Sequence, residues 1–268
     1  MNNNTSSNIN LKANVLAFKK YRYMVSNLIK KDITTKYRRS VLGILWSVLN
    51  PLLMMLVTTA VFQYLFRSDI ENFPIYYLTG SLLFNFVAEA TTSSMTSVLG
   101  SATLIKKVYI PKYLFPLQKC LFSFVNMLFS LVALVIMYIV LKIVPPWTII
   151  LAPIPMLYAL LFSFGIGLIL SSLIIFFRDI GHLYSVWITV WMYLTPIIYP
   201  IEALPSSVSR IVKINPLYHI IKYFRNVTLY GIIPTFRDNI ICLSCGMVVL
   251  IIGLIIFKKT QDKFILYI

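Results

Sequence analysis

Long apolar runs alternate with shorter polar segments along this chain. Six runs approach or exceed the roughly 20 residues that cross about 30 Å of hydrocarbon in a bilayer. The second run is more polar than the others, since it holds Glu89 and a Thr/Ser-rich stretch at 91–97. Pro153 predicts a kinked entry to the fourth, and Pro196 lies near the end of the short fifth. The pattern predicts an all-α membrane protein with spans at 44–66, 73–98, 120–141, 148–176, 183–200 and 239–257.

Composition supports a membrane protein and excludes several other classes. Hydrophobic residues make up 59% of the chain and charged residues 12%, against roughly 45–50% and about 25% in soluble domains. Intrinsic disorder and a disulfide-stapled scaffold, with three cysteines, therefore fit poorly. The net charge of +16 comes from basic clusters that flank the apolar runs, which indicates topology and lipid contact and argues against nucleic-acid binding.

The distribution of Lys and Arg predicts the orientation in the membrane. With the N-terminus inside, the inner segments carry 17 of these residues and the outer segments 7, so both termini are expected in the cytoplasm. The first fourteen residues lack the pattern of a cleaved signal peptide, so the first span is expected to be retained. The expected division is a cytoplasmic tail with an interface helix (1–43), a six-span domain (44–257) and a cytoplasmic tail (258–268).

Residues 14–40 combine a basic surface with an apolar stripe. Spacings of three and four residues predict one helical face, which suits a helix lying in the inner membrane interface. A helix that covers a protein partner is the alternative. The stripe consists of Phe18, Tyr21, Val25, Leu28, Ile29 and Ile33.

The inner segment 101–119 predicts a short helix from Ser101, with Leu104, Ile105 and Val108 on one face. Lys106 and Lys107 point elsewhere. A short amphipathic helix here would suit docking of a soluble partner. The alternative structure for this segment is a turn that its lysines hold at the lipid surface.

The outer segment 201–236 predicts two short amphipathic helices, arranged as a re-entrant hairpin or lid. Asn215 can cap a helix that starts at Pro216, a favoured arrangement. A second candidate runs from Ser206 to Lys213. The apolar stripe of the capped helix consists of Leu217, Ile220, Ile221 and Phe224.

Chemistry-bearing residues are few. No Gly-rich phosphate loop is present, so ATP is not expected to bind through such a loop. Glu89 lies within a predicted span, either hydrogen-bonded to its neighbours or coupled to protons. Cys242 and Cys245 suit packing between helices. His182 and His219 have no other potential metal ligands near them in the sequence, so neither a metal site nor a catalytic site is expected.

Ordered motifs give the chain a family resemblance. They are Tyr37, Ser40, Leu42, Gly43, Trp46 and Pro51 before and within the first span, Leu104 to Lys107 with Pro111 and Pro116, Phe177 to Ile180, Thr195 to Ile197, Leu204-Pro205 and Asn215 to Leu217. In this order the motifs resemble the permease subunit of ABC transporters that export polysaccharides, namely O-antigen, teichoic acid and capsule. The resemblance runs from about residue 25 to the C-terminus.

The resemblance implies a homodimer in the bacterial cytoplasmic membrane with two separate ATPase subunits, which would bind ATP and Mg; no cofactor is expected on this chain. It implies export of a glycan on an undecaprenyl-type lipid pyrophosphate. The outer helices, with Asn215, Pro216, Leu217, Ile220, Ile221 and Phe224, would form the gate. Residues 101–112 would hold the coupling helix, and the ATPase contacts would be Leu104, Ile105, Lys106, Lys107, Val108, Tyr109, Ile110, Pro111, Arg178 and Asp179.

Two further sets of residues are candidates for substrate contact. Aromatic side chains of the first and fifth spans could line the glycan path, although packing is the alternative: Trp46, Tyr184, Trp187, Trp191 and Tyr193. Basic residues at the inner interface match a lipid pyrophosphate, although they equally suit anionic lipid and topology: Lys30, Lys31, Arg38 and Arg39.

For Arg178 and Asp179, a local charge pair that caps a helix is the alternative to an ATPase contact. For the chain as a whole, the competing functions are an ABC permease for a drug or small lipid and, in another class, an ion-coupled secondary transporter. The latter would favour intramembrane ionisable pairs or inverted repeats, which the sequence does not display.

Overall fold

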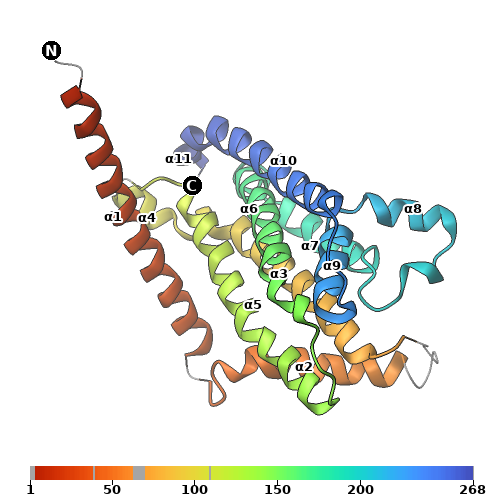
Figure 1. Ribbon diagram of the computed structural model, residues 1–268. Helices are drawn as coiled ribbons and strands as arrows, with labels where there is room; N and C mark the ends of the chain where they lie inside the picture. Colours follow the sequence, from red (N-terminus) through yellow and green to blue (C-terminus); the bar gives the residue numbers. More distant parts are fainter. Residues whose placement is uncertain (1–3, 39, 63–69, 109, 268) are drawn as a thin grey trace.

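The computed structural model describes residues 4–38, 40–62, 70–108 and 110–267, and all regular structure in these ranges is helical. Four long helices form the body of the molecule: α3 (Phe73–Gly100), α5 (Leu114–Val140), α6 (Pro153–Phe176) and α10 (Phe236–Thr260). α3 packs on both α5 and α6, and α6 packs on α10 (Figure 1). The predicted all-α fold class is confirmed for the described residues.

Three segments are long and apolar enough to cross a membrane by themselves: Leu114–Val140, Trp147–Phe176 and Phe236–Tyr267. They correspond to the third, fourth and sixth predicted spans. α3, with 28 residues, is long enough to cross a membrane but is more polar than these three segments. In the described part of the first predicted span, α2 (Leu45–Ala60) has 16 residues, fewer than a span needs. The six-span count therefore stays a prediction, whereas three strongly apolar helices among the described residues support a membrane protein.

The fifth predicted span, 183–200, is wrong in its extent. α7 runs from Ile180 to Tyr193, 14 residues, and the chain then turns. Thr195 precedes Pro196, and a residue before proline is disfavoured in the α conformation. The hydroxyl of Thr195 instead donates to the carbonyl oxygen of Trp191 at 2.7 Å. A short helix followed by a turn replaces the expected longer span.

A proline marks the entry of the fourth span as the sequence indicates, and a glycine contact found in the structure brings this span close to α10. A 3-10 helix, Trp147–Leu151, precedes α6, which begins at Pro153, so the irregular entry is confirmed. Farther along, a Cβ on Gly253 of α10 would lie 2.5 Å from the carbonyl oxygen of Gly165 in α6. The two helices can approach this closely because neither residue carries a side chain, a common arrangement in membrane bundles.

α1 (Asn4–Tyr37) begins ten residues earlier than the predicted amphipathic segment and runs beside α5 (Figure 1). Val25 on its predicted apolar stripe is buried and Ile29 is partly covered, while Lys30 and Lys31 are exposed. Part of the apolar stripe therefore covers a helix of the same chain.

The predicted short helices are present at both ends of the bundle. On the segment between α3 and α5 lies α4 (Ala102–Lys107). Between α7 and α10 lie α8 (Ser206–Ile214) and α9 (Pro216–Arg225). A further short helix that was not predicted, α11 (Phe264–Tyr267), follows α10. Three features lie toward the upper end of the bundle in Figure 1: the helix α4, the helix α11 and the N-terminal end of α1.

Candidate functional site

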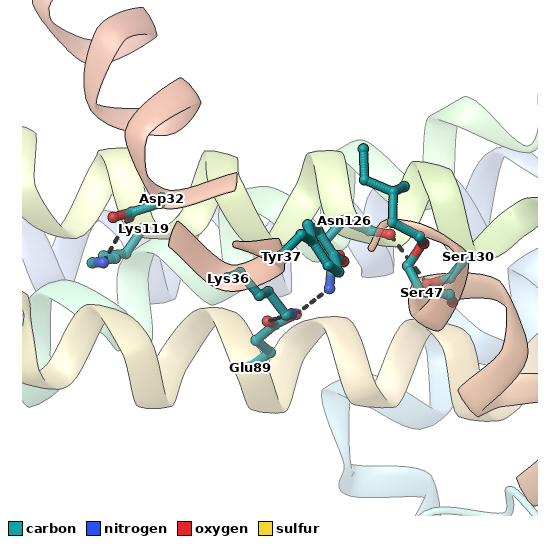
Figure 2. A network of polar contacts seen from close by, with 9 residues as sticks. Asp32, Lys36, Tyr37, Ser47, Glu89, Lys119, Asn126 and Ser130 are labelled. Atoms are coloured by element: carbon teal, nitrogen blue, oxygen red, sulfur yellow. Dashed lines mark hydrogen bonds and ion pairs between the residues drawn. The ribbon is translucent and has the colours of Figure 1, made fainter. Parts of the chain in front are cut away.

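Lys36 of α1 and Glu89 of α3 form an ion pair, with 2.6 Å between Lys36 Nζ and Glu89 Oε1. Asn126 of α5 donates from Nδ2 to Glu89 Oε2 at 3.0 Å, and the Tyr37 hydroxyl donates to Asn126 Oδ1 at 2.5 Å. Figure 2 shows these side chains meeting between the three helices. Both oxygens of Glu89 thus have partners, all of them from elements distant in the sequence.

A second polar contact fastens α1 one turn earlier. Asp32 Oδ2 lies 2.6 Å from Lys119 Nζ (Figure 2). Gln118 Nε2 also donates to Asp32 Oδ2. The side chains of the two ion pairs are 22–37% exposed, so solvent screens them and each contributes about 1 kcal/mol or less to stability. Their effect is to fix the position of α1 on α5 and α3.

A cavity of about 570 Å³ adjoins this polar network, between the end of α1 and helices α2, α3 and α5. Ser130 closes one side by donating to the Ser47 carbonyl oxygen at 2.8 Å (Figure 2). The walls are unusually polar for the interior of an apolar bundle. They comprise Lys36, Tyr37, Trp46, Ser47, Asn50, Pro51, Met54, Leu82, Asn85, Phe86, Glu89, Asn126, Met127 and Ser130.

The network lies at depth in the bundle. Glu89 is about 16 Å from the α4 end of α3, and Asn126 about 18 Å from the start of α5, at 1.5 Å per helical residue. Ionisable groups at such depth are costly unless they are paired and usually mark functional regions. Glu89 is hydrogen-bonded, but its partners are Lys36 and Asn126 from distant elements and not the neighbouring residues that the sequence suggested.

Arg225, at the end of α9, connects several segments near the beginning of α3, at the end of this helix that lies away from α4. It is buried, and its guanidinium donates to the carbonyl oxygens of Pro196, Ile197 and Tyr76 at 2.6, 2.9 and 3.2 Å. Among the described residues, no carboxylate pairs with it. Its contacts join the turn after α7 to the beginning of α3 and to α9.

The predicted capped helix that starts at Pro216 is confirmed in detail. Asn215 Oδ1 accepts a hydrogen bond from the Leu217 backbone N–H at 3.0 Å, and Pro216 occupies the first helical position. The predicted apolar stripe of α9 faces the core, since Leu217, Ile220, Ile221 and Phe224 are all at most 1% exposed.

Comparison with known proteins identifies the family. A sequence profile of ABC-2 type transporters matches residues 24–229, most of the chain. The chain belongs to the ABC-2 type transporter family.

Similar ABC-2 transporters are named for polysaccharide export, which confirms the resemblance inferred from the motifs. The O-antigen export system permease protein RfbA of Klebsiella pneumoniae is 30% identical over 241 residues, covering 88% of this chain and 92% of the relative. RfbA of Myxococcus xanthus is 25% identical over 91% of this chain and 95% of that protein. The capsule polysaccharide export inner-membrane protein CtrC of Neisseria meningitidis is 22% identical, covering 88% and 90%.

In this ABC-2 transporter four of the predicted coupling residues on or next to α4 are exposed. Leu104 and Val108 are exposed, and Lys106 and Lys107 are exposed beside them on or just after α4. Ile105, Ile110 and Pro111 are partly covered, while Tyr109 lies outside the described residues.

Arg178 and Asp179 are both exposed in the turn between α6 and α7. Asp179 occupies the N-cap position of α7, but its side chain makes no capping hydrogen bond. It also forms no ion pair with Arg178 in the described part of the chain. The local-capping interpretation therefore has no contact to support it, and the ATPase contact stays a prediction.

The predicted aromatic lining divides into two groups. Trp187 and Tyr193 are 49% and 64% exposed, and Trp46 faces the polar cavity. Tyr184 and Trp191 are buried. The Tyr184 hydroxyl donates to Thr91 Oγ1 at 2.7 Å, and Trp191 Nε1 donates to Asn215 Oδ1 at 2.9 Å.

Three of the proposed pyrophosphate-binding residues, Lys30, Lys31 and Arg38, are exposed on or next to α1. Arg39 lies outside the described residues. Their accessibility is compatible with a lipid pyrophosphate and equally with anionic lipid, so this role also stays a prediction.

Sequence reasoning missed Lys36, Asn126 and Arg225 as site residues. The spacing of Arg225 held a signal, because it follows Ile221 by four positions and therefore extends the apolar stripe of α9. Asn126 is likewise a polar residue in the strongly apolar third run. No comparable signal marked Lys36, whose partner Glu89 is 53 positions away.

Proposed function

We propose that this chain is the transmembrane permease subunit of an ATP-driven exporter that moves a lipid-linked polysaccharide across the bacterial cytoplasmic membrane. The observation that carries the proposal is 30% identity over nearly the whole length of an O-antigen export permease. The glycan would be O-antigen, teichoic acid or a similar polymer on an undecaprenyl-type pyrophosphate. The comparisons favour neither a drug or small-lipid permease nor an ion-coupled transporter.

The proposed assembly contains two copies of this chain and two ATPase subunits, which bind ATP and Mg. Exposed Leu104, Val108, Arg178 and Asp179 support an ATPase contact, because they leave apolar and charged groups available in two neighbouring inner segments. α8 and α9 would act as gate helices. In this proposal α2, α3 and α7 supply the remaining three of six spans, and both termini are cytoplasmic.

The proposed path for the glycan passes the exposed aromatic residues of α2 and α7, Trp46, Trp187 and Tyr193. Aromatic rings present apolar faces to a sugar without the strong binding that charges would impose. Lys30, Lys31, Arg38 and Arg39 would meet the lipid pyrophosphate at the inner surface. Neutralising Arg38 and Arg39 together should then reduce export more than membrane insertion.

The test is transport by the reconstituted complex. The permease is purified with its ATPase, placed in vesicles and supplied with lipid-linked glycan from the host. The expected result is ATP-dependent movement of glycan, with none when the permease or the ATPase is omitted. ATP hydrolysis by the permease alone, or glycan movement without nucleotide, would contradict the proposal.

A further inference from the structure

The cavity between α2, α3 and α5 has unused hydrogen-bonding capacity. Asn85 is exposed although both its neighbours in α3, Phe84 and Phe86, are at most 3% exposed. It is exposed because it lines the cavity. Asn50 of α2 is exposed on the same cavity, and neither amide has a hydrogen-bond partner among the described residues. Each amide offers two N–H donors and a carbonyl acceptor.

The formal charges in this cavity cancel. Lys36 and Glu89 are the charged residues in its lining, and they neutralise each other at 2.6 Å. A phosphate, a carboxylate or a metal cation would have to break this pair to gain a counter-charge. An uncharged ligand with many hydroxyl groups can instead bond to the free amides while the pair stays intact.

An aromatic ring completes the lining. Trp46 at the start of α2 is 46% exposed and borders the cavity. Its ring offers an apolar face for the C–H groups of a sugar, while its edge is polar. The volume of about 570 Å³ is within the roughly 300–1,000 Å³ that is typical of small-molecule pockets.

We propose that this cavity binds an uncharged sugar ring of the exported glycan, held by the Asn50 and Asn85 amides and stacked on Trp46. The inference rests on the proposed export function and adds a site within a single permease copy. A glycerol headgroup of a membrane lipid has similar hydroxyl chemistry, so the experiment separates the two sources.

The test measures binding to the purified permease–ATPase complex in nanodiscs. The probe is the oligosaccharide released by mild acid from the lipid carrier of cells lacking the ATPase, and the readout is tryptophan fluorescence. We expect saturable binding that is weakened at least tenfold by Asn85→Leu and by Asn50→Leu. Thr96→Ala, at an exposed position of α3 outside the cavity, is the matched control and should bind as the unaltered protein does.

The outcomes distinguish the site from the function. Binding that is unaffected by both asparagine variants, with complexes that still assemble, would overturn the sugar site. So would a response that depends on phosphatidylglycerol in the nanodisc and not on added oligosaccharide. ATP-dependent export by the unaltered complex in vesicles is measured separately, and its absence would reject the proposed function itself.

Discussion

The guanidinium of Arg225 lies 3.6 Å from the centroid of the Tyr76 ring. The same cation donates to two consecutive carbonyl oxygens in the turn after α7, those of Pro196 and Ile197. Stacking on an aromatic face stabilises a desolvated arginine, and the carbonyl groups accept hydrogen bonds from its two terminal nitrogens, Nη1 and Nη2. The buried Nε has no hydrogen-bond partner in the described part of the chain. This arrangement joins the first turn of α3 to the turn after α7 and to α9 without an acidic partner among the described residues.

Arg225→Met should destabilise the protein by about 3 kcal/mol, because it leaves buried carbonyl oxygens without donors. Thermal unfolding of the detergent-solubilised protein measures the loss. Arg210→Met, at an exposed position of α8, is the control and should change the melting temperature little. Equal melting temperatures for the two variants would remove Arg225 from this role.

Gly253→Ala should weaken the packing of α10 on α6 by about 1–3 kcal/mol. The added Cβ would lie 2.5 Å from a backbone oxygen of Gly165, so the helices must separate. Gly100→Ala is the matched control, because a Cβ there meets no atom within 4 Å. Thermal unfolding should show a lower melting temperature for the first variant alone.

Lys36→Glu should loosen the end of α1, because it places two carboxylates where an ion pair was. Combining it with Glu89→Lys should restore much of the loss, with a coupling energy of about 1 kcal/mol for this partly exposed pair. The double-mutant cycle is measured by thermal unfolding. Lys31→Glu, exposed on the same helix, serves as the control, and the absence of coupling would mean that the pair contributes nothing to the position of α1.

Trp187→Leu and Trp191→Leu should have different effects. Loss of the exposed Trp187 should slow glycan export several-fold while the melting temperature stays the same. Loss of the buried Trp191 should lower the melting temperature, since Asn215 Oδ1 loses the indole N–H donor. Export assays in vesicles and thermal unfolding distinguish the two, and normal export by Trp187→Leu would argue against an aromatic lining.

Reversing both charges at Arg178 and Asp179 should reduce co-purification of the ATPase several-fold. In the described structure Asp179 makes no capping hydrogen bond, and neither side chain forms an ion pair. No contact within the described part of the permease therefore accounts for these two charges. Arg210→Glu, at an exposed position of α8, is the control. If the double variant recovers as much ATPase as the unaltered protein, Arg178 and Asp179 do not contribute to the ATPase contact.

Elements whose determinants are local could be predicted from the sequence. The cap at Asn215, the proline at 216 and the spacing of Leu217, Ile220, Ile221 and Phe224 define α9 within ten residues, and the structure agrees. The apolar stripe of α1 was also predictable. Its position against α5 was not, because the ion pair with Lys119 joins residues 87 positions apart.

The candidate site was largely beyond sequence reasoning for the same reason. Glu89 was recognisable as an ionisable residue in an apolar run, but its partners come from α1 and α5 and depend on how those helices pack. The early end of α7 was partly predictable from Pro196. Apolar residues continue to Tyr199, however, and hydrophobicity alone could not separate helix from turn.

In the proposed six-span arrangement, the length of α7 has a consequence for the surrounding lipid. Fourteen residues rise about 21 Å, whereas the hydrocarbon layer is about 30 Å thick. Acyl chains that meet such a helix must compress, or neighbouring protein must shield its ends. A locally thinned membrane at this flank would shorten the distance over which a bulky hydrophilic headgroup crosses between leaflets.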